Sequence, residues 1–146
     1  NCILQRNIKM NDLIDFLNEG DRFAATNGMQ LTEVREGYAR AEMKVEARHL
    51  NAAGVCQGGA YFTLADLAFA AVTNSHGNIT LGIQNSITFL QSAHEGDTLI
   101  AEAEETFNHH RLPFCEIRVS NQRGELVCIV TGSAYRTNKE FKDIQL

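Results

Sequence analysis

Residues 58–75 read GGAYFTLADLAFAAVTNS, and this stretch decides the fold. It is rich in alanine, leucine and phenylalanine and would be apolar almost all the way round a helix, which is typical of a helix buried in a core. The sequence His76-Gly77-Asn78 that follows provides a stop, because Gly77 suits the left-handed position at a helix C-terminus. We therefore expect a central helix that the rest of the chain surrounds.

The segments on either side of this stretch carry the alternation of apolar and polar residues that is typical of strands. Strands are expected at 29–34, 38–45, 79–90, 97–108, 113–121 and 126–136. A short amphipathic helix is expected at 11–17, and a loop at 49–55. Because the connections are short, the strands should be largely antiparallel and should curl around the central helix. The expected fold class is α+β, in one domain over residues 1–146.

The composition is that of an ordinary globular protein and argues against several kinds of partner. Apolar residues make up 44% and charged residues 21% of the chain. No stretch approaches the roughly 18 uncharged apolar residues of a membrane span, and the N-terminus shows no secretory signal. The formal charge is −5 and the 13 basic residues are scattered, whereas phosphate binding needs a concentrated basic face. We expect neither a membrane nor a nucleic acid as partner.

The four cysteines, Cys2, Cys56, Cys115 and Cys128, have neither CxxC spacing nor a Cys/His ligand pattern. Cys115 and Cys128 fall in expected strands among apolar neighbours, where a free cysteine behaves as a small apolar residue. Reduced cysteines in a cytoplasmic protein are therefore favoured over a disulfide framework.

Asp66 is the only residue between Arg48 and Glu95 that should carry a full charge at pH 7, histidines aside. Its neighbours one turn away in the expected helix include Phe62 and Phe69. A carboxylate in such surroundings loses hydration, which raises its pKa unless donors or cations compensate. Two interpretations stay open: Asp66 caps or pairs with a group in the core, or it is a general base or nucleophile beside a pocket.

Gly58 and Gly59 stand at the start of the expected helix. Two glycines leave the backbone N–H groups of the first turn unobstructed, and such an amide can hold a carbonyl oxygen that gains negative charge. The other interpretation is that the pair simply allows tight packing between the loop and the helix. A Gly-Gly pair on its own does not choose between the two.

Together, these residues resemble the hotdog thioesterases of the phenylacetate-degradation type. That family has an Asn, a Gly three residues later, His-Gly-Gly at a helix start and an Asp two turns in; residues 49–69 read HLNAAGVCQGGAYFTLADLAF. Downstream, SITFLQSAHEGDTLIAEAE and GELVCIVTGSAYR resemble the family's later strands. The resemblance covers about residues 25–137 and implies a hotdog fold, an antiparallel sheet wrapped around a long central helix. It divides the chain into an N-terminal helical segment (1–27), a hotdog core (28–137) and a tail (138–146).

The resemblance also implies an activity, the hydrolysis of acyl-CoA thioesters, and roles for single residues. Asp66 would activate water as a general base or attack the thioester itself, the Gly58 N–H would polarise the thioester carbonyl, and Asn51 would orient the water or the carboxylate. In this family the sites form between subunits, so the resemblance implies a homodimer with shared active sites, and two such dimers commonly join into a homotetramer. No cofactor is implied, because coenzyme A is part of the substrate.

The sequence departs from the family pattern at three places. Gln57 stands where the family has His, so any acid–base role of that His is absent. Gly82 stands where some members have a Ser or Thr that holds the water; Ser86 and Thr88 are expected to share the face of Gly82 and could partly substitute. Gln91-Ser92 replaces the usual Arg-Pro, which removes one possible phosphate contact.

The expected acyl pocket is apolar and lies between subunits, with basic residues near it for the nucleotide of CoA. The residues expected to bind the acyl group are Gly59, Phe62, Phe69, Gly82 and Phe89, and those expected near the nucleotide are His109, His110, Arg111 and Arg136. The second set, with Lys139, could equally be ordinary solvated charges. A metal site is not expected, because His109 and His110 have no third ligand in the right context.

Other functions stay open. A hotdog protein could bind acyl-CoA and sense or present it without cleavage, and Gln57 and Gly82 favour this alternative. A hotdog hydratase or dehydratase needs a His-plus-acid pair, and His49 is too far upstream to supply it. Cys56, just before the helix, could be a nucleophile with a depressed pKa, although a packing role is the simpler interpretation.

Overall fold

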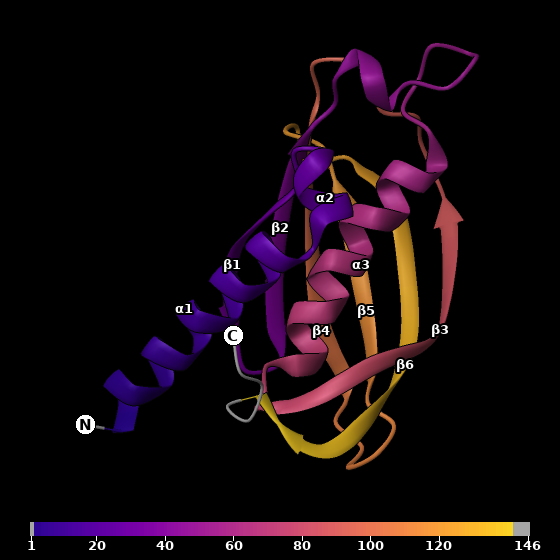
Figure 1. Cartoon of the computed structure of the whole chain (residues 1–146). Coiled ribbons are helices and arrows are strands. Elements are labelled where there is room, and N and C mark those ends of the chain that lie inside the picture. Colours follow the sequence, from indigo (N-terminus) through magenta and orange to yellow (C-terminus); the bar gives the residue numbers. More distant parts are fainter. Residues whose placement is uncertain (1, 142–146) are drawn as a thin grey trace.

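Six strands form one antiparallel sheet that wraps around a central helix (Figure 1). The computed structural model describes residues 2–141. The elements are α1 (Cys2–Gly20), α2 (Arg22–Thr26), β1 (Gln30–Arg35), β2 (Tyr38–Lys44), η1 (Ala47–His49), α3 (Gly58–Asn74), β3 (Asn78–Phe89), β4 (Thr98–Phe107), β5 (Phe114–Ser120) and β6 (Leu126–Glu140). The strand order across the sheet is β1-β2-β4-β5-β6-β3, and every neighbouring pair is antiparallel. The predicted α+β class is confirmed.

The core lies between α3 and the concave face of the sheet. Leu64 and Leu67 of α3 are fully buried, as are Leu99 of β4 and Ile117 of β5. Burying a side chain of this size stabilises the fold by roughly 1.5–3 kcal/mol. Each strand presents alternate residues to α3, which is the physical origin of the alternation in the sequence. Within the described part of the chain, no helix combines the length and the apolar character needed to span a bilayer.

Helix α1 is longer than the helix predicted at 11–17. The Asn18 side chain donates from Nδ2 to the Leu31 carbonyl (3.1 Å) and accepts the Leu31 N–H at Oδ1 (2.8 Å). The Phe16 ring meets the Phe141 ring edge to face, with centroids 4.9 Å apart. Such tertiary contacts hold a helix whose local sequence pattern is weak.

Strand β6 continues to Glu140, past the end predicted at Arg136. The additional length pairs with the start of β3, where Asn78 lies opposite Glu140, and the Thr137 hydroxyl donates to the Ile79 carbonyl (2.7 Å). The predicted tail therefore begins inside the sheet. Its later part, residues 142–146, lies outside the described residues.

The structure corrects one expectation about α3. The helix packs on the sheet, and α1 and α2 contact α3 itself (Figure 1). Asp66 nevertheless lies on a face of α3 that is exposed in the single chain. Phe62 and Thr63 on the same face are half-buried. Residues 10–141 cover this strip only partly, so a helix that is apolar almost all round is not fully buried. We refer to this strip (Phe62, Thr63, Asp66 and Ala70) as the open face of α3.

A β-bulge in β3 changes which residues face α3. The register of β3 against β6 shifts between Gly82 and Gln84. Gly82 lies opposite the fully buried Ala134, so it belongs to the inner face. Downstream, the odd-numbered residues lie opposite the buried positions of β6, so Ser86 and Thr88 point to the outer face. The expectation that they share the face of Gly82 is therefore wrong, because a bulge inverts the alternation that follows it.

Candidate active site

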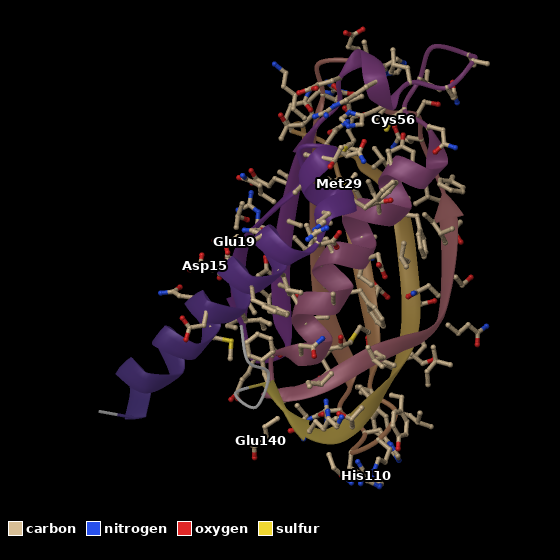
Figure 2. The ribbon with its side chains drawn as sticks, in the orientation of Figure 1. Asp15, Glu19, Met29, Cys56, His110 and Glu140 are labelled. Atoms are coloured by element: carbon tan, nitrogen blue, oxygen red, sulfur yellow. The ribbon has the colours of Figure 1, made fainter. Side chains whose placement is uncertain are left out.

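A pocket of about 430 Å³ opens at the N-terminus of α3, at the end of the molecule marked by Cys56 in Figure 2. It is lined by Asn51, Val55, Cys56, Gly58, Tyr61, Phe89, Leu90, Gln91 and Ser92. These residues come from the loop before α3, the first turn of α3 and the end of β3. None of them is an acid or a base that is charged at neutral pH, so the pocket fits a neutral and largely apolar group. Asn51, Gly58 and Phe89 were predicted as site residues, and the structure brings these three together.

Gly58 supplies the first backbone donor of α3, and no acceptor in residues 2–141 binds its N–H. The N-terminus of a helix leaves such a donor with partial positive charge. A Cβ at position 58 would lie 2.9 Å from Cζ of Phe89, so a larger residue here would have to push this ring aside. Gly58 therefore combines tight packing with a free backbone donor, so its packing and functional interpretations do not exclude each other.

Tyr61 is a pocket residue that the sequence analysis did not single out. Its hydroxyl accepts the Ala93 N–H (2.6 Å) and donates to the Gln91 carbonyl (3.4 Å), and its ring lies 5.9 Å from that of Phe89. Tyr61 thus ties the end of β3 to the first turn of α3. Its position three residues after Gly58, one helical turn along the same side, was the available signal.

The Gln57 side chain caps α3. Its Oε1 atom accepts the Gly59 N–H, while its own backbone N–H donates to the His49 carbonyl (2.8 Å). The Gly59 N–H is therefore occupied, and the Gly58 N–H is the donor left for an incoming oxygen. This capping bond is not the acid–base role that the family resemblance implies for a His at this position.

Asn51 organises the loop that forms one wall of the pocket. Its Oδ1 atom accepts the N–H groups of Ala53 (2.9 Å) and Val55 (3.3 Å). Gly54 completes the turn with a φ of 78°, in the left-handed region that favours glycine. The Nδ2 group binds no acceptor in residues 2–141, so it is the part of Asn51 that could bind water or substrate.

Asp66 lies on the open face of α3 and is not among the residues that line the pocket. Although its surface is exposed in the single chain, partial desolvation raises the pKa of its carboxyl group, and the Asp21 carboxylate raises it further. Asp66 follows Gly58 by eight residues, which is about 12 Å along a helix axis. In one chain the two groups therefore cannot contact the same carbonyl group.

The aromatic residues predicted to hold the acyl group lie in three different places. Phe89 lines the pocket. Phe62 lies on the open face of α3, and Cε1 of the buried Phe69 is 3.2 Å from the position that a Cβ of Gly82 would occupy. Phe69 and Gly82 thus pack directly against each other, which explains why a glycine is tolerated on this strand.

The residues predicted near the nucleotide of CoA lie at the end of the molecule opposite the pocket, as the labels of His110 and Cys56 in Figure 2 show. Nδ1 of His109 accepts the Leu112 N–H (3.0 Å), and the two histidine rings are 4.4 Å apart. Nη1 of Arg111 donates to the carbonyl of Arg136 (3.0 Å). In the single chain these groups organise the connection between β4 and β5.

Arg136 likewise makes its contacts within its own chain. Its Nη2 atom lies 3.7 Å from Oε2 of Glu105, and its Nη1 atom donates to Oδ1 of Asn108 (2.9 Å). His76 contacts the same carboxylate, with Nε2 3.0 Å from Oε2. Only 11% of the Arg136 side chain and 7% of the Glu105 side chain are exposed. A contact of this set with a nucleotide stays a prediction.

Cys56 does not have the properties of a nucleophile. It is buried, and burial raises the pKa of its thiol to about 11, whereas a nucleophilic cysteine needs a depressed pKa. Cys56, Cys115 and Cys128 are all free and buried. Packing at the wall of the pocket accounts for Cys56.

Comparison with known proteins identifies the family. The family model of the Thioesterase superfamily matches residues 53–128, which include Gly58 and Asp66. The chain belongs to the thioesterase superfamily. A putative esterase of Archaeoglobus fulgidus is 41% identical over 127 residues, which are 87% of this chain and 82% of that protein. Acyl-coenzyme A thioesterase PaaI of Escherichia coli is 34% identical over 118 residues, 81% of this chain and 84% of the relative.

Two solved structures share the fold. The PaaI protein of Escherichia coli matches with a TM-score of 0.86 at 31% identity, over 90% of this chain and 96% of that one. A Streptococcus mutans protein bound to acetyl CoA matches with a TM-score of 0.73 at 27% identity, over 77% and 90% of the two chains. The predicted hotdog fold and the resemblance to PaaI-like thioesterases are confirmed.

Proposed function

We propose that this member of the thioesterase superfamily hydrolyses acyl-CoA thioesters to a free acid and coenzyme A. The observation that carries the proposal is the unpaired Gly58 N–H at the wall of an uncharged pocket. The acyl-coenzyme A thioesterase PaaI and the acetyl CoA complex of the Streptococcus mutans protein support the substrate class. The reaction uses only water besides the thioester, so it calls for no cofactor.

Asp66 acts as the general base in this reaction. Its raised pKa makes its carboxylate a stronger base toward water than an ordinary aspartate. The water oxygen attacks the thioester carbon while Asp66 takes the proton, and the carbonyl oxygen becomes an oxyanion that accepts the Gly58 N–H. Collapse of this intermediate breaks the C–S bond, and the departing thiolate takes up the proton held by Asp66.

Two copies of the chain form each site. Because Asp66 and Gly58 of one chain are about 12 Å apart along α3, the two groups at one thioester come from different chains. β3 is the open edge of the sheet, where Leu81 and Ile83 are 61% and 58% exposed. A second copy that pairs antiparallel along this edge brings its α3 beside the first in the opposite direction. The Asp66 of each copy then approaches the Gly58 of the other.

The other edge of the sheet is less suited to this pairing. Strand β1 lies under α1, and the Asn18 side chain already binds both the N–H and the carbonyl of Leu31. A blocked edge of this kind does not accept a further strand. The contrast between the two edges favours a homodimer through β3.

We also propose a homotetramer and a cytoplasmic location. Phe107, Phe114 and Tyr135 are exposed apolar residues on the outer face of the sheet, and they offer a surface for a second dimer. The free thiols of Cys56 and Cys128 are typical of a reducing compartment such as the cytoplasm.

The second candidate function is acyl-CoA binding without cleavage. The observation that favours it is that the Gln57 side chain is taken up in capping α3, while Gly82 has no hydroxyl group to hold a water. A protein of this kind would keep the pocket and the Gly58 N–H but would not position the attacking water.

The experiment that separates the two functions is thiol release from a panel of short, medium, long and aromatic acyl-CoAs. Asp66→Asn is expected to lose about 10²–10⁴-fold in kcat. The matched control is Asp15→Asn, which makes the same chemical change on an exposed position of α1 (Figure 2). Thermal stabilisation by acyl-CoA without any thiol release from the unsubstituted protein would favour the binding function instead.

A further inference from the structure

His49 is a buried histidine at the base of the loop that forms one wall of the pocket, and only 4% of its surface is exposed. Its Nδ1 atom accepts the Glu46 N–H (2.9 Å), and its Nε2 atom lies 2.9 Å from the Asn27 carbonyl oxygen. A carbonyl oxygen can only accept a hydrogen bond, so the ring proton is on Nε2 and the imidazole is neutral. The ring therefore joins η1 to the C-terminus of α2, where Asn27 is the cap.

The backbone of His49 closes the loop of residues 50–57, which we call the pocket loop. The His49 carbonyl accepts the Gln57 N–H (2.8 Å), so the two ends of the loop are held together. Gln57 comes immediately before Gly58, and Asn51 lies two residues after His49. A displacement of His49 therefore moves two groups at the wall of the pocket, the Gly58 N–H and the Asn51 side chain.

The other contacts around the pocket loop leave its first half loosely held. Residues 51–54 are exposed. The Cys56 N–H donates to the Ala93 carbonyl (2.8 Å), which fixes the second half. Arg48 donates to the Thr26 carbonyl, but 45% of the Arg48 side chain is exposed, and exposed polar contacts hold a segment weakly. The buried imidazole is therefore the firm link between the start of the loop and α2.

Filling space does not by itself require a histidine at position 49. A leucine would occupy a similar volume but would leave the Glu46 N–H and the Asn27 carbonyl without their partner. A neutral imidazole has an acceptor and a donor at different corners of one rigid ring. Asparagine can reproduce only the acceptor at the place of Nδ1, and glutamine only the donor at the place of Nε2. The two hydrogen bonds can therefore be removed one at a time.

We propose that His49 is a positioning residue for thioester hydrolysis, because its imidazole sets the place of the pocket loop and thereby that of the Gly58 N–H. The inference rests on the proposed function, in which the oxyanion accepts this N–H. His49 is buried and is not among the residues that line the pocket, so it acts through the loop. A misplacement of about 1 Å costs about 100-fold in rate. Because the oxyanion forms only in the transition state, the loss should fall on kcat, with little change in KM.

The test measures kcat and KM for thiol release in folded variants. We expect His49→Leu to lower kcat by about 100-fold. His49→Asn and His49→Gln, which keep one hydrogen bond each, are expected to lower it by about tenfold. His94→Leu makes the same change on a histidine whose side chain is 66% exposed, and Ile117→Val lowers stability in the core away from the pocket loop. Both controls should keep the original kcat.

An unchanged kcat in His49→Leu overturns the proposal, and so does an equal loss of kcat in Ile117→Val at matched Tm. If the leucine variant does not fold, the two amide variants decide, and an unchanged kcat in both of them overturns it.

If the unsubstituted protein hydrolyses no thioester, the proposed hydrolysis fails by itself. Amide hydrogen exchange then decides whether His49 sets the place of the pocket loop. The Gln57 N–H should exchange about tenfold faster in His49→Gln than in the unsubstituted protein, while the Val119 N–H in β5 should be unchanged. Unchanged exchange at Gln57 overturns the role of His49.

Discussion

Replacing Gly58 with alanine tests the geometry of the pocket directly. The added Cβ would lie 2.9 Å from Cζ and 3.1 Å from Cε1 of Phe89. Carbon atoms pack at about 3.5–4.0 Å, so the ring has to retreat by roughly 0.5–1 Å. Overpacking of this kind costs about 1–3 kcal/mol, and we expect the lower end because Phe89 is 53% exposed and its ring can move.

The two consequences are measurable in separate assays. A loss of about 1 kcal/mol lowers the Tm of a chain of this size by about 3 °C. The displaced ring also narrows the pocket at the Gly58 N–H, and a misplacement approaching 1 Å is expected to lower kcat/KM for acyl-CoA by about 10–100-fold. Thermal unfolding and thiol release report these effects independently.

The matched control is Phe89→Leu, which removes the ring atoms that the new Cβ would meet. Adding Gly58→Ala to this background is expected to cost less stability and less activity than adding it to the unsubstituted protein. A Gly58→Ala variant with unchanged Tm and unchanged kcat/KM would refute the reasoning. Equal costs in the two backgrounds would show that Phe89 is not the obstacle.

Four further predictions concern Asp66, the β3 edge and Arg136. The base must be ionised, so kcat/KM should fall as the pH drops through the pKa of Asp66, which is raised above the ordinary value of 3.8. A pH profile of kcat/KM whose acidic midpoint lies at or below 3.8 would contradict this. Because folding disfavours the charged form of a group with raised pKa, the contribution of Asp66 to stability should decline as the pH rises from 3.8 through that pKa. Asp66→Asn should therefore unfold no earlier than the unsubstituted protein at pH 7. Leu81→Lys places a charge on the open edge and should give inactive monomers in light scattering; an active dimer would exclude pairing through β3. Arg136→Met removes one partner of the buried Glu105 and should cost about 3 kcal/mol in chemical unfolding with KM for acyl-CoA unchanged. A raised KM at unchanged stability would make Arg136 a nucleotide contact.

The candidate site was predictable where it depends on a short stretch of chain. A loop that runs directly into a helix leaves little freedom, so Asn51 and Gly58 had to lie near each other, and both line the pocket. For Tyr61 the only sequence signal is its helical spacing from Gly58, because its hydrogen bond with the Ala93 N–H joins residues 32 positions apart. Contacts of that length leave no local pattern in the sequence.

By itself, the sequence determined the central helix, the order and approximate bounds of the strands and the isolated charge of Asp66, because local periodicity records which side of an element is buried. Only the tertiary structure decided that the face around Asp66 is open in one chain, that Ser86 and Thr88 turn away from Gly82, and that Arg136 binds Glu105 at the end remote from the pocket. Each of these facts depends on strand register or on packing between distant segments. A single bulge reverses every side chain after it, and such a shift is set by the neighbouring strand rather than by the residues of the strand itself.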